Sequence, residues 1–173
     1  KHKIIAQGAE AIIYLNNKNH IVKDRMPKSY RIKELDNKIR RLRTKAEAKL
    51  LKKAGKIISC PKILADPGFG RMIHMEFIDG KRLSEHLNNF IKEKQEKILE
   101  KIGKEISKLH EENIIHGDLT TSNMILKNNS VYLIDFGLGY QNGKYEDKAV
   151  DIHLLKQALE AKHFQFHEEL FES

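Results

Sequence analysis

The residues most able to do chemistry in this sequence lie in one short loop and in the segment that follows it. The stretch IIHGDLTTSN (114–123) ends an apolar run with Asp118, and Asn123 follows five residues later. Asp135, in YLIDFG, comes twelve residues after Asn123. Carboxylate and amide oxygens suit Mg²⁺, and a positioned carboxylate can activate a hydroxyl or a water. The set therefore predicts a magnesium site that works beside a nucleoside triphosphate.

A cation for the phosphates and a group to orient it are expected earlier in the chain, because phosphoryl transfer depends on positioning and on charge. Gly8 lies between two predicted strands, where a small-residue turn lets backbone N–H groups approach phosphates. Lys23 ends the apolar run IVK, and Glu47 lies in a basic helix from which it could orient Lys23. Each also has an ordinary interpretation: a hairpin turn, an edge-strand lysine, and a surface ion pair with Arg43.

The hydrophobic pattern of the first half predicts a sheet and one long helix. The expected strands are Lys3–Ala6, Ala11–Leu15, His20–Lys23, Ile57–Ala65 and Arg71–Ile78. A helix is expected over Glu34–Ala54, with Gly55 as its stop. Its expected apolar stripe consists of Leu35, Ile39, Leu42, Ala46 and Leu50.

The second half is expected to be mostly helical. Ser84 is the expected cap of a helix that begins SEHLNNFI, and Asp151–Leu170 is the expected final helical region. A small hairpin is expected to pair Met124–Leu126 with Val131–Ile134 around Asn128 and Asn129. A second apolar stripe consists of Ile98, Ile102, Ile106 and Leu109. A β-rich half followed by a helical half with the chemistry in its loops is an α+β, two-lobed plan.

Length and composition favour a globular domain. The chain has 173 residues, of which 40% are hydrophobic and 32% are charged. No apolar run reaches the length of a membrane span, and the first residues lack the pattern of a signal peptide. A single cysteine, Cys60, fits a reducing compartment, so a cytoplasmic location is expected. The chain does not begin with Met, which fits either a trimmed chain or a piece of a longer fused polypeptide.

The net charge of +8 is unevenly distributed. Residues 18–56 contain 15 Lys/Arg and 4 Asp/Glu, which leaves the remainder of the chain slightly negative. This asymmetry favours an anionic partner, which could be a nucleotide, an RNA or an acidic protein face. The alternative is a solvated basic helix with no partner.

The motifs resemble those of protein-kinase-like enzymes. HGDLTTSN resembles the HRDLxxxxN catalytic loop, with Gly117 in place of Arg, and Asp135-Phe136-Gly137 matches the metal-binding DFG motif. Together with GAEAIIY, VKxRxPKxYR, ELDxxIRxxRTxxEAxLL, IDFGLG and EDKAVD, they are similar to the PRPK family. That family is the small atypical kinase/ATPase of the KEOPS (EKC) complex.

The resemblance covers about Gly8 to Asp151 and implies a fold. The fold is a minimal bilobal protein-kinase-like fold of class α+β, with a β-rich N-lobe that carries one main helix and a reduced, mostly helical C-lobe. The chain would be a single kinase-like domain over residues 1–173, with an N-lobe of about 1–78 and a C-lobe of about 79–173.

The resemblance also implies how ATP would be bound. The shortened phosphate loop would consist of Gly8, Ala9, Glu10 and Ala11, and Glu10 would stiffen it. Lys23 would contact the α- and β-phosphates and pair with Glu47. Residues 75–78 would form the hinge under adenine, where Glu76 and Ile78 would offer backbone groups.

For catalysis, the resemblance implies that Asp118 is the acid/base and that Asn123 and Asp135 are the Mg²⁺ ligands. Asp151 would lie in a helix that braces the catalytic loop from below; its ordinary interpretation is a helix N-cap. The implied cofactors are ATP and Mg²⁺.

The implied function is that of an atypical serine/threonine kinase or ATPase that supports synthesis of N6-threonylcarbamoyladenosine (t6A) in tRNA. The implied partners are the threonylcarbamoyltransferase subunit of KEOPS, fused or separate, and other KEOPS subunits. A tRNA contact through the basic helix Lys33–Lys56 is also expected, and no membrane contact is.

Three alternatives remain open at this stage: an independent Ser/Thr protein kinase, an aminoglycoside- or choline-type kinase, and a non-enzymatic RNA-binding module. Only thirteen residues separate Gly137 from Asp151, and no APE motif is present, which argues against a platform for peptide substrates. The resemblance also implies a basic C-terminal tail, whereas this sequence ends in the acidic HEELFES, which fits either a missing tail or a member that differs.

Overall fold

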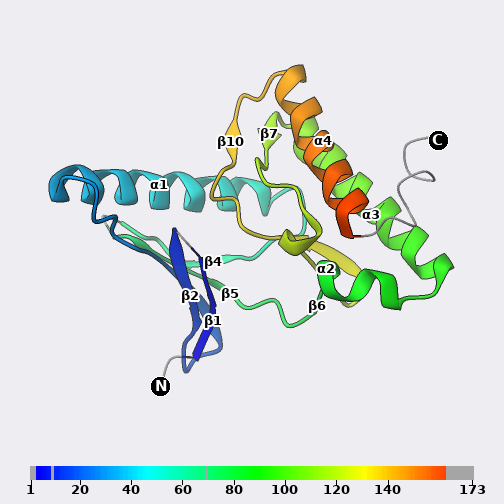
Figure 1. Ribbon diagram of the computed structural model, residues 1–173, viewed down its shortest axis with the longest axis horizontal. Coiled ribbons are helices and arrows are strands. Elements are labelled where there is room, and N and C mark those ends of the chain that lie inside the picture. Colours follow the sequence, from blue (N-terminus) through cyan, green and yellow to red (C-terminus); the bar gives the residue numbers. More distant parts are fainter. Residues whose placement is uncertain (1–2, 9, 69, 163–173) are drawn as a thin grey trace. The chain divides into compact units, whose positions relative to one another are not determined.

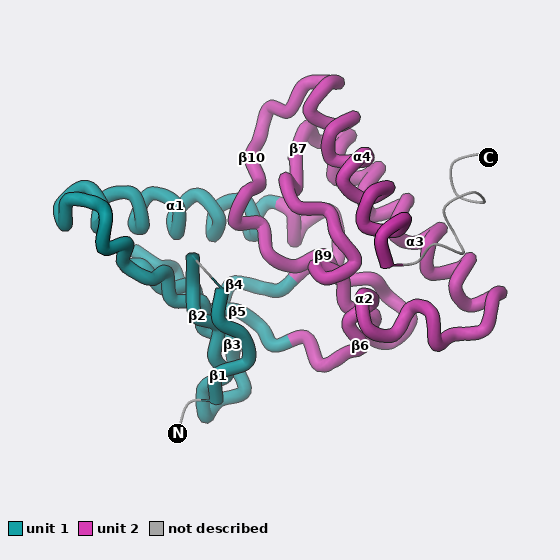
Figure 2. The backbone as a smooth tube through the Cα atoms, in the orientation of Figure 1, with its two compact units in different colours: residues 1–53, 61–77 teal, residues 54–60, 78–173 magenta. Residues whose placement is uncertain are grey.

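A computed structural model describes residues 3–8, 10–68 and 70–162 and divides the chain into two units, each with its own sheet (Figure 2). Unit 1 consists of residues 1–53 and 61–77, and unit 2 consists of residues 54–60 and 78–173. Strands dominate unit 1 and helices dominate unit 2 (Figure 1), so the α+β class predicted from the sequence is confirmed.

Unit 1 is built on a five-stranded antiparallel sheet with the order β1-β2-β3-β5-β4. The strands are β1 (Lys3–Gln7), β2 (Ala11–Leu15), β3 (His20–Arg25), β4 (Ile63–Ala65) and β5 (Met72–Glu76). Strand β3 is central and pairs along its length with β2 and β5. The turn before β3 is closed by the Asn16 side chain, which accepts hydrogen bonds from the N–H groups of Lys18 and His20.

The long helix α1 (Lys33–Ala54) exists as predicted, but its predicted apolar stripe is wrong except at Leu50. Leu42 is 58% exposed and Leu35 is 50% exposed. Leu50 is buried as predicted, and the other buried positions of α1 are Asp36, Arg40, Thr44, Glu47, Ala48, Leu51 and Ala54.

Polar contacts explain why this other face of α1 is buried. Arg40 Nη1 donates to the carbonyl of Arg25 at 3.2 Å, and Thr44 Oγ1 donates to the carbonyl of Arg71 at 3.2 Å. An apolar cluster accompanies these bonds, in which Ala48 of α1 packs with Ile73 and Met75 and with the partly buried Ile21 and Ile63. Tertiary hydrogen bonds, which periodicity cannot report, therefore decide which side of the helix is buried.

The segment after α1 corrects a second prediction, because the expected strand over Ile57–Ala65 is only Ile63–Ala65. The N–H groups of Ile57 and Ile58 both donate to the carbonyl of Ala54 at 2.9 Å, which closes the helix end instead of extending the chain. The expected strand over Arg71–Ile78 is likewise shorter, and spans Met72–Glu76.

Unit 2 combines two small sheets with helices. A three-stranded antiparallel sheet has the order β6-β8-β9, and a separate pair joins β7 to β10. The strands are β6 (Lys81–Arg82), β7 (Ile114–Ile115), β8 (Met124–Lys127), β9 (Ser130–Leu133) and β10 (Tyr140–Gln141). The helices are α2 (Leu83–His86), α3 (Lys92–Glu111) and α4 (Tyr145–Lys162), with the 3₁₀ turns η1 (Leu87–Asn89) and η2 (Thr121–Asn123).

The hairpin and the α3 stripe of unit 2 were predicted correctly. Strands β8 and β9 are joined by Asn128 and Asn129, whose φ angles are +47° and +63°, as a two-residue hairpin turn requires. The predicted stripe of α3 is buried at all four positions, Ile98, Ile102, Ile106 and Leu109.

The helix boundaries in unit 2 differ from the predictions. Ser84 does not cap a helix, because α2 begins at Leu83 and has no side-chain cap. Helix α4 begins at Tyr145 rather than Asp151, and the carboxylate of Asp147 accepts the N–H of Lys144 at 2.7 Å at its first turn. This bond is the main cause that lowers the pKa of Asp147. The part of the expected final helix beyond Lys162 lies outside the described residues.

Among the residues that the structure describes, no helix is long and apolar enough to cross a membrane.

The buried face of α1 can be tested with the same substitution at two leucines. Leu51→Ala should lower the free energy of unfolding of the protein by about 3 kcal/mol, because Leu51 is 2% exposed and its truncation leaves a buried cavity. Leu42→Ala should change it by less than about 0.5 kcal/mol, because Leu42 is exposed. Chemical unfolding followed by circular dichroism measures both. Similar losses at the two positions would contradict the observed orientation of α1.

Candidate active site

Asp118, in the loop after β7, is hydrogen-bonded to Asn123, the last residue of η2. The Asn123 Nδ2 group donates to the Asp118 backbone carbonyl at 3.0 Å and to its carboxylate Oδ2 at 2.8 Å. Both neighbours on that side of the amide are acceptors, so the amide nitrogen must lie there and Oδ1 must point away. Asn123 therefore presents an oxygen, the atom that a hard cation binds.

Asp135 lies two residues after the end of strand β9. The N–H of Ile134 donates to the carbonyl of Asn123 at 2.9 Å, which ties the segment before Asp135 to η2. Asp135 has a φ of +61°, and its Oδ1 accepts the N–H of Gly137 at 3.2 Å. A non-glycine residue in the left-handed region is uncommon and is often found at functional sites.

Gly117 is required by the backbone at its position. Its φ is +80°, and a Cβ atom there would lie 2.5 Å from the carbonyl oxygen of Leu138. No side chain fits without moving the backbone. The glycine that replaces the arginine of ordinary kinases thus follows from the close approach of the segment after the DFG motif.

Asp151, from α4, holds the catalytic loop in place. Its carboxylate accepts the backbone N–H groups of His116 at 2.8 Å and Gly117 at 2.9 Å, and it lies 3.0 Å from Nε2 of His110. Asp151 is buried and lies within α4 rather than before its first residue, so the N-cap interpretation is wrong. The predicted bracing position is confirmed.

His116 connects the catalytic loop with the DFG segment. The N–H of Asp118 donates to Nδ1 of His116 at 3.3 Å, so Nε2 carries the proton and donates to the carbonyl of Ile134 at 3.0 Å. The imidazole also packs on the ring of Phe136, with centroids 4.6 Å apart. Burial lowers the pKa of His116 below its ordinary value and outweighs the opposing effect of Asp151.

The donor set fits Mg²⁺ better than a metal that proteins bind in full cages. No group of three or more His, Cys, Asp or Glu side chains in the described residues could hold a metal ion. Mg²⁺ usually takes one or two protein oxygens and completes its shell with phosphates and water. Asn123 and Asp135, on adjoining segments, offer such a partial shell.

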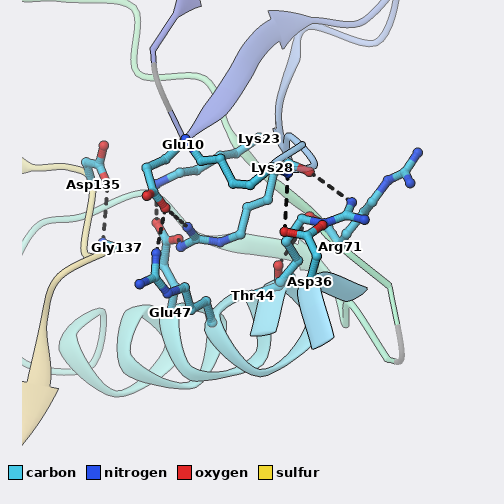
Figure 3. A network of polar contacts seen from close by, with 12 residues as sticks. Glu10, Lys23, Lys28, Asp36, Thr44, Glu47, Arg71, Asp135 and Gly137 are labelled. Atoms are coloured by element: carbon cyan, nitrogen blue, oxygen red, sulfur yellow. Dashed lines mark hydrogen bonds and ion pairs between the residues drawn. The ribbon is translucent and has the colours of Figure 1, made fainter. Parts of the chain in front are cut away.

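In unit 1, Lys23 and Glu47 form the predicted ion pair, with Nζ 2.8 Å from Oε1. Lys23 is buried on the central strand, so its interpretation as an edge lysine is wrong. Glu47 is buried too and does not pair with Arg43; its second oxygen, Oε2, accepts a hydrogen bond from Arg25 Nη2 at 2.6 Å. Figure 3 shows Glu10, Lys23 and Glu47 in one polar network.

The segment predicted to form the phosphate loop connects β1 to β2. The N–H of Gly8 donates to the carbonyl of Ala11 at 3.0 Å, and Ala11 is buried. Glu10 is fixed by a 2.6 Å bond from Arg43 Nη1 to its carboxylate and by a 3.0 Å bond from Met26 N–H to its carbonyl. Ala9 lies outside the described residues.

The two hinge residues differ in their surroundings. The N–H of Glu76, one of the two residues predicted to form the hinge, donates to the carbonyl of Lys62 at 2.9 Å. Ile78 is buried and belongs to unit 2.

Sequence reasoning missed three residues that shape the site. Arg25 is the second partner of Glu47, His110 contacts Asp151, and His116 joins the two catalytic segments. Arg25 lies two residues after Lys23, which places both side chains on one face of β3. That spacing was a signal that could have identified Arg25.

Comparison with known proteins agrees with this geometry. The RIO domain family matches residues 9–149. The chain is 43% identical to the KEOPS complex subunit Bud32 of Pyrococcus abyssi, over 98% of this chain and 82% of that protein. It is 42% identical to the EKC/KEOPS complex subunit bud32 of Dictyostelium discoideum, over 92% of this chain and 68% of that protein.

The chain therefore belongs to the RIO family of kinase-like domains. Within it, the chain is a member of the Bud32 (PRPK) family, as the sequence motifs predicted, and it has the minimal kinase-like fold of that family.

Longer relatives match as well. The chain is 44% identical to a probable bifunctional tRNA threonylcarbamoyladenosine biosynthesis protein of Methanobrevibacter smithii. That match covers 91% of this chain but only 29% of the longer protein.

The lowered pKa of His116 predicts how stability depends on pH. The unfolded chain binds a proton at this histidine near pH 6.5, while the folded chain keeps it neutral. Folding stability should therefore be complete above pH 6.5 and fall below it, by up to about 1.4 kcal/mol per pH unit. Urea unfolding between pH 7.5 and 5.5 measures the slope, and His116→Gln should make it shallower. Equal slopes in the two proteins would contradict the assignment.

Proposed function

We propose that the chain is an ATP-dependent phosphotransferase or ATPase that supports t6A synthesis in tRNA as a subunit of a KEOPS complex. The observation that carries the proposal is the pairing of Asp118 with Asn123, which leaves the amide oxygen of Asn123 available as a ligand beside the Asp135 segment. The names of the Bud32 relatives support the complex, and those of the bifunctional relatives support the tRNA modification.

In the proposed chemistry, Asn123 and Asp135 hold Mg²⁺, and Lys23 binds the α- and β-phosphates of ATP. The bound metal would supply neutralisation of the charge that develops on the γ-phosphoryl group. Glu47 orients Lys23, and residues 8–11 cover the phosphates with backbone N–H groups. The backbone groups of Glu76 and Ile78 bind adenine.

Asp118 is the proposed acid/base. Its carboxylate is fixed by Asn123, so one oxygen is held at 2.8 Å from an amide while the other can accept the proton of a hydroxyl or a water. The imidazole of His116 is neutral and buried, and its contacts hold the loop rather than take part in proton transfer.

The proposed phosphate acceptor is water or a hydroxyl of the chain itself. The segment between Gly137 and α4 is short, and its β10 residues Tyr140 and Gln141 are paired with β7. This leaves little chain to form a platform for a peptide substrate, which argues against an independent protein kinase.

The proposed partners are the threonylcarbamoyltransferase subunit, separate or fused, and other KEOPS subunits. A partner that modifies tRNA and the single cysteine together favour a cytoplasmic location.

ATP turnover with the two catalytic aspartates changed tests the proposal. Asp118→Asn or Asp135→Asn should lower turnover by about 10²- to 10⁴-fold, because each change removes a charge from the reacting groups. The unfolding midpoint should stay the same, and Asp66→Asn, at an exposed carboxylate, is the matched control. ATP labelled at the γ-phosphate identifies the acceptor, whether protein, tRNA or water. Unimpaired turnover in either catalytic variant would refute the assignment.

The outer face of α1 is the proposed contact for tRNA. Lys38, Arg41, Lys45 and Lys49 are exposed and follow one another at steps of three and four residues, so they form a row on one face of the helix. The acidic residues Asp36 and Glu47 are buried on the other side of α1. Such a row suits the regularly spaced phosphates of an RNA backbone.

Charge reversal in this row tests the RNA contact. The triple variant Lys38→Glu, Arg41→Glu, Lys45→Glu should weaken tRNA binding and reduce the slope of log affinity against log salt by about 2–3, since each lost phosphate contact accounts for about 1. A control with the same charge change on α3, Lys97→Glu, Lys104→Glu, Lys108→Glu, should lose less affinity. Filter binding at several salt concentrations measures both. Equal losses in the two triple variants would show that only net charge matters.

A further inference from the structure

The Glu47 carboxylate is shared by two cations. Oε1 lies 2.8 Å from Lys23 Nζ, and Oε2 lies 2.6 Å from Arg25 Nη2. All three side chains are buried, with exposed fractions of 8% for Lys23, 5% for Arg25 and 1% for Glu47. Each oxygen thus has its own donor, and the orientation of the carboxylate is set from both sides.

The second cation also reaches the phosphate loop. Arg25 Nη1 lies 3.8 Å from Glu10 Oε2, the oxygen that Arg43 Nη1 binds at 2.6 Å. Opposite charges therefore alternate along a chain of side chains, from Lys23 through Glu47, Arg25 and Glu10 to Arg43. This order compensates the positive charge that two buried cations on one carboxylate would leave.

Stability alone does not account for Arg25. Its Nε atom is buried and has no hydrogen-bond partner among the residues that the structure describes, which is a cost to the folded state. Apolar residues can often replace buried ion pairs without loss of stability. The positions of its neighbours, rather than folding energy, are what Arg25 contributes.

We propose that Arg25 is a positioning residue that fixes Glu47 so that Lys23 is held ready for the phosphates of ATP. The inference rests on the proposed function, because that function assigns Lys23 to the phosphates. In protein kinases the lysine–glutamate pair is controlled through the activation segment. In this chain only thirteen residues separate Gly137 from Asp151, and Arg25 fixes the pair from within unit 1.

The first test uses ATP binding and turnover by the full chain. Arg25→Gln should weaken the binding of a fluorescent ATP analogue and raise KM for ATP by about 10- to 100-fold, since Lys23 loses its fixed position. The effect on kcat should be smaller. Arg25→Lys keeps the charge but not the planar fork, so its affinity should be intermediate. Arg71→Gln removes an exposed arginine of the same unit and should leave ATP affinity unchanged.

A double-mutant cycle distinguishes positioning from direct contact with ATP. In a Lys23→Met background, Arg25→Gln should cause no further loss of ATP affinity, because Arg25 acts through Lys23. Additive losses would overturn the proposal, and so would wild-type affinity in Arg25→Gln. If Arg25→Gln does not fold, Arg25→Lys decides, and wild-type affinity in that variant overturns it.

A measurement without nucleotide separates this proposal from the proposed function. The acylation rate of the Lys23 amine, followed by mass spectrometry on the folded protein, should rise in Arg25→Gln by about 10-fold or more, because a fixed buried amine becomes mobile. The exposed Lys97 serves as the internal reference. An unchanged rate at Lys23 overturns the positioning role even if the wild-type chain binds ATP. A wild-type chain that does not bind ATP overturns both proposals.

Discussion

The carboxylate of Asp151 is the constraint on which the catalytic half of the structure depends. It gathers two successive backbone N–H groups, those of His116 and Gly117, and the ring of His110 onto a single buried charge. Backbone N–H groups next to a buried carboxylate cannot rotate away without leaving that charge unsolvated. The loop is therefore fixed just before Asp118. His116 also contacts the DFG segment, through the carbonyl of Ile134 and the ring of Phe136. Helix α4 thus holds the loop that carries the proposed catalytic residue Asp118.

In unit 1, hydrogen bonds and buried ion pairs join helix α1 to the strands, in addition to its apolar contacts. Arg40 and Thr44 bond backbone carbonyls, and Glu47 receives two cations from β3. Hydrogen bonds and ion pairs are directional, so they fix the rotation of α1 about its own axis more narrowly than an apolar contact of similar size would. In the proposed function this precision matters for Lys23, because small displacements of a group that contacts a reacting phosphate cost large factors in rate.

The features that could be predicted from the sequence are those that depend on residues close together in the chain. The α3 stripe and the Asn128–Asn129 turn were predicted correctly, because apolar periodicity and left-handed asparagine are properties of the residues themselves. The α1 stripe was wrong except at Leu50, because Arg40 and Thr44 donate hydrogen bonds to the carbonyls of residues distant in sequence, and these bonds bury the polar side of the helix. Motif spacing identified Asp118 and Asn123 as candidates, and the two-residue spacing of Lys23 and Arg25 on β3 could also have identified Arg25 as the second partner of Glu47.

Gly117 has a consequence for the history of the chain. With a Leu138 carbonyl where a Cβ would lie, the position cannot gain an arginine by a point mutation without moving the backbone. An arginine beside the catalytic aspartate is the kind of group that could bind a phosphorylated activation segment. A chain with this backbone therefore cannot use an arginine at position 117 to bind a phosphorylated segment.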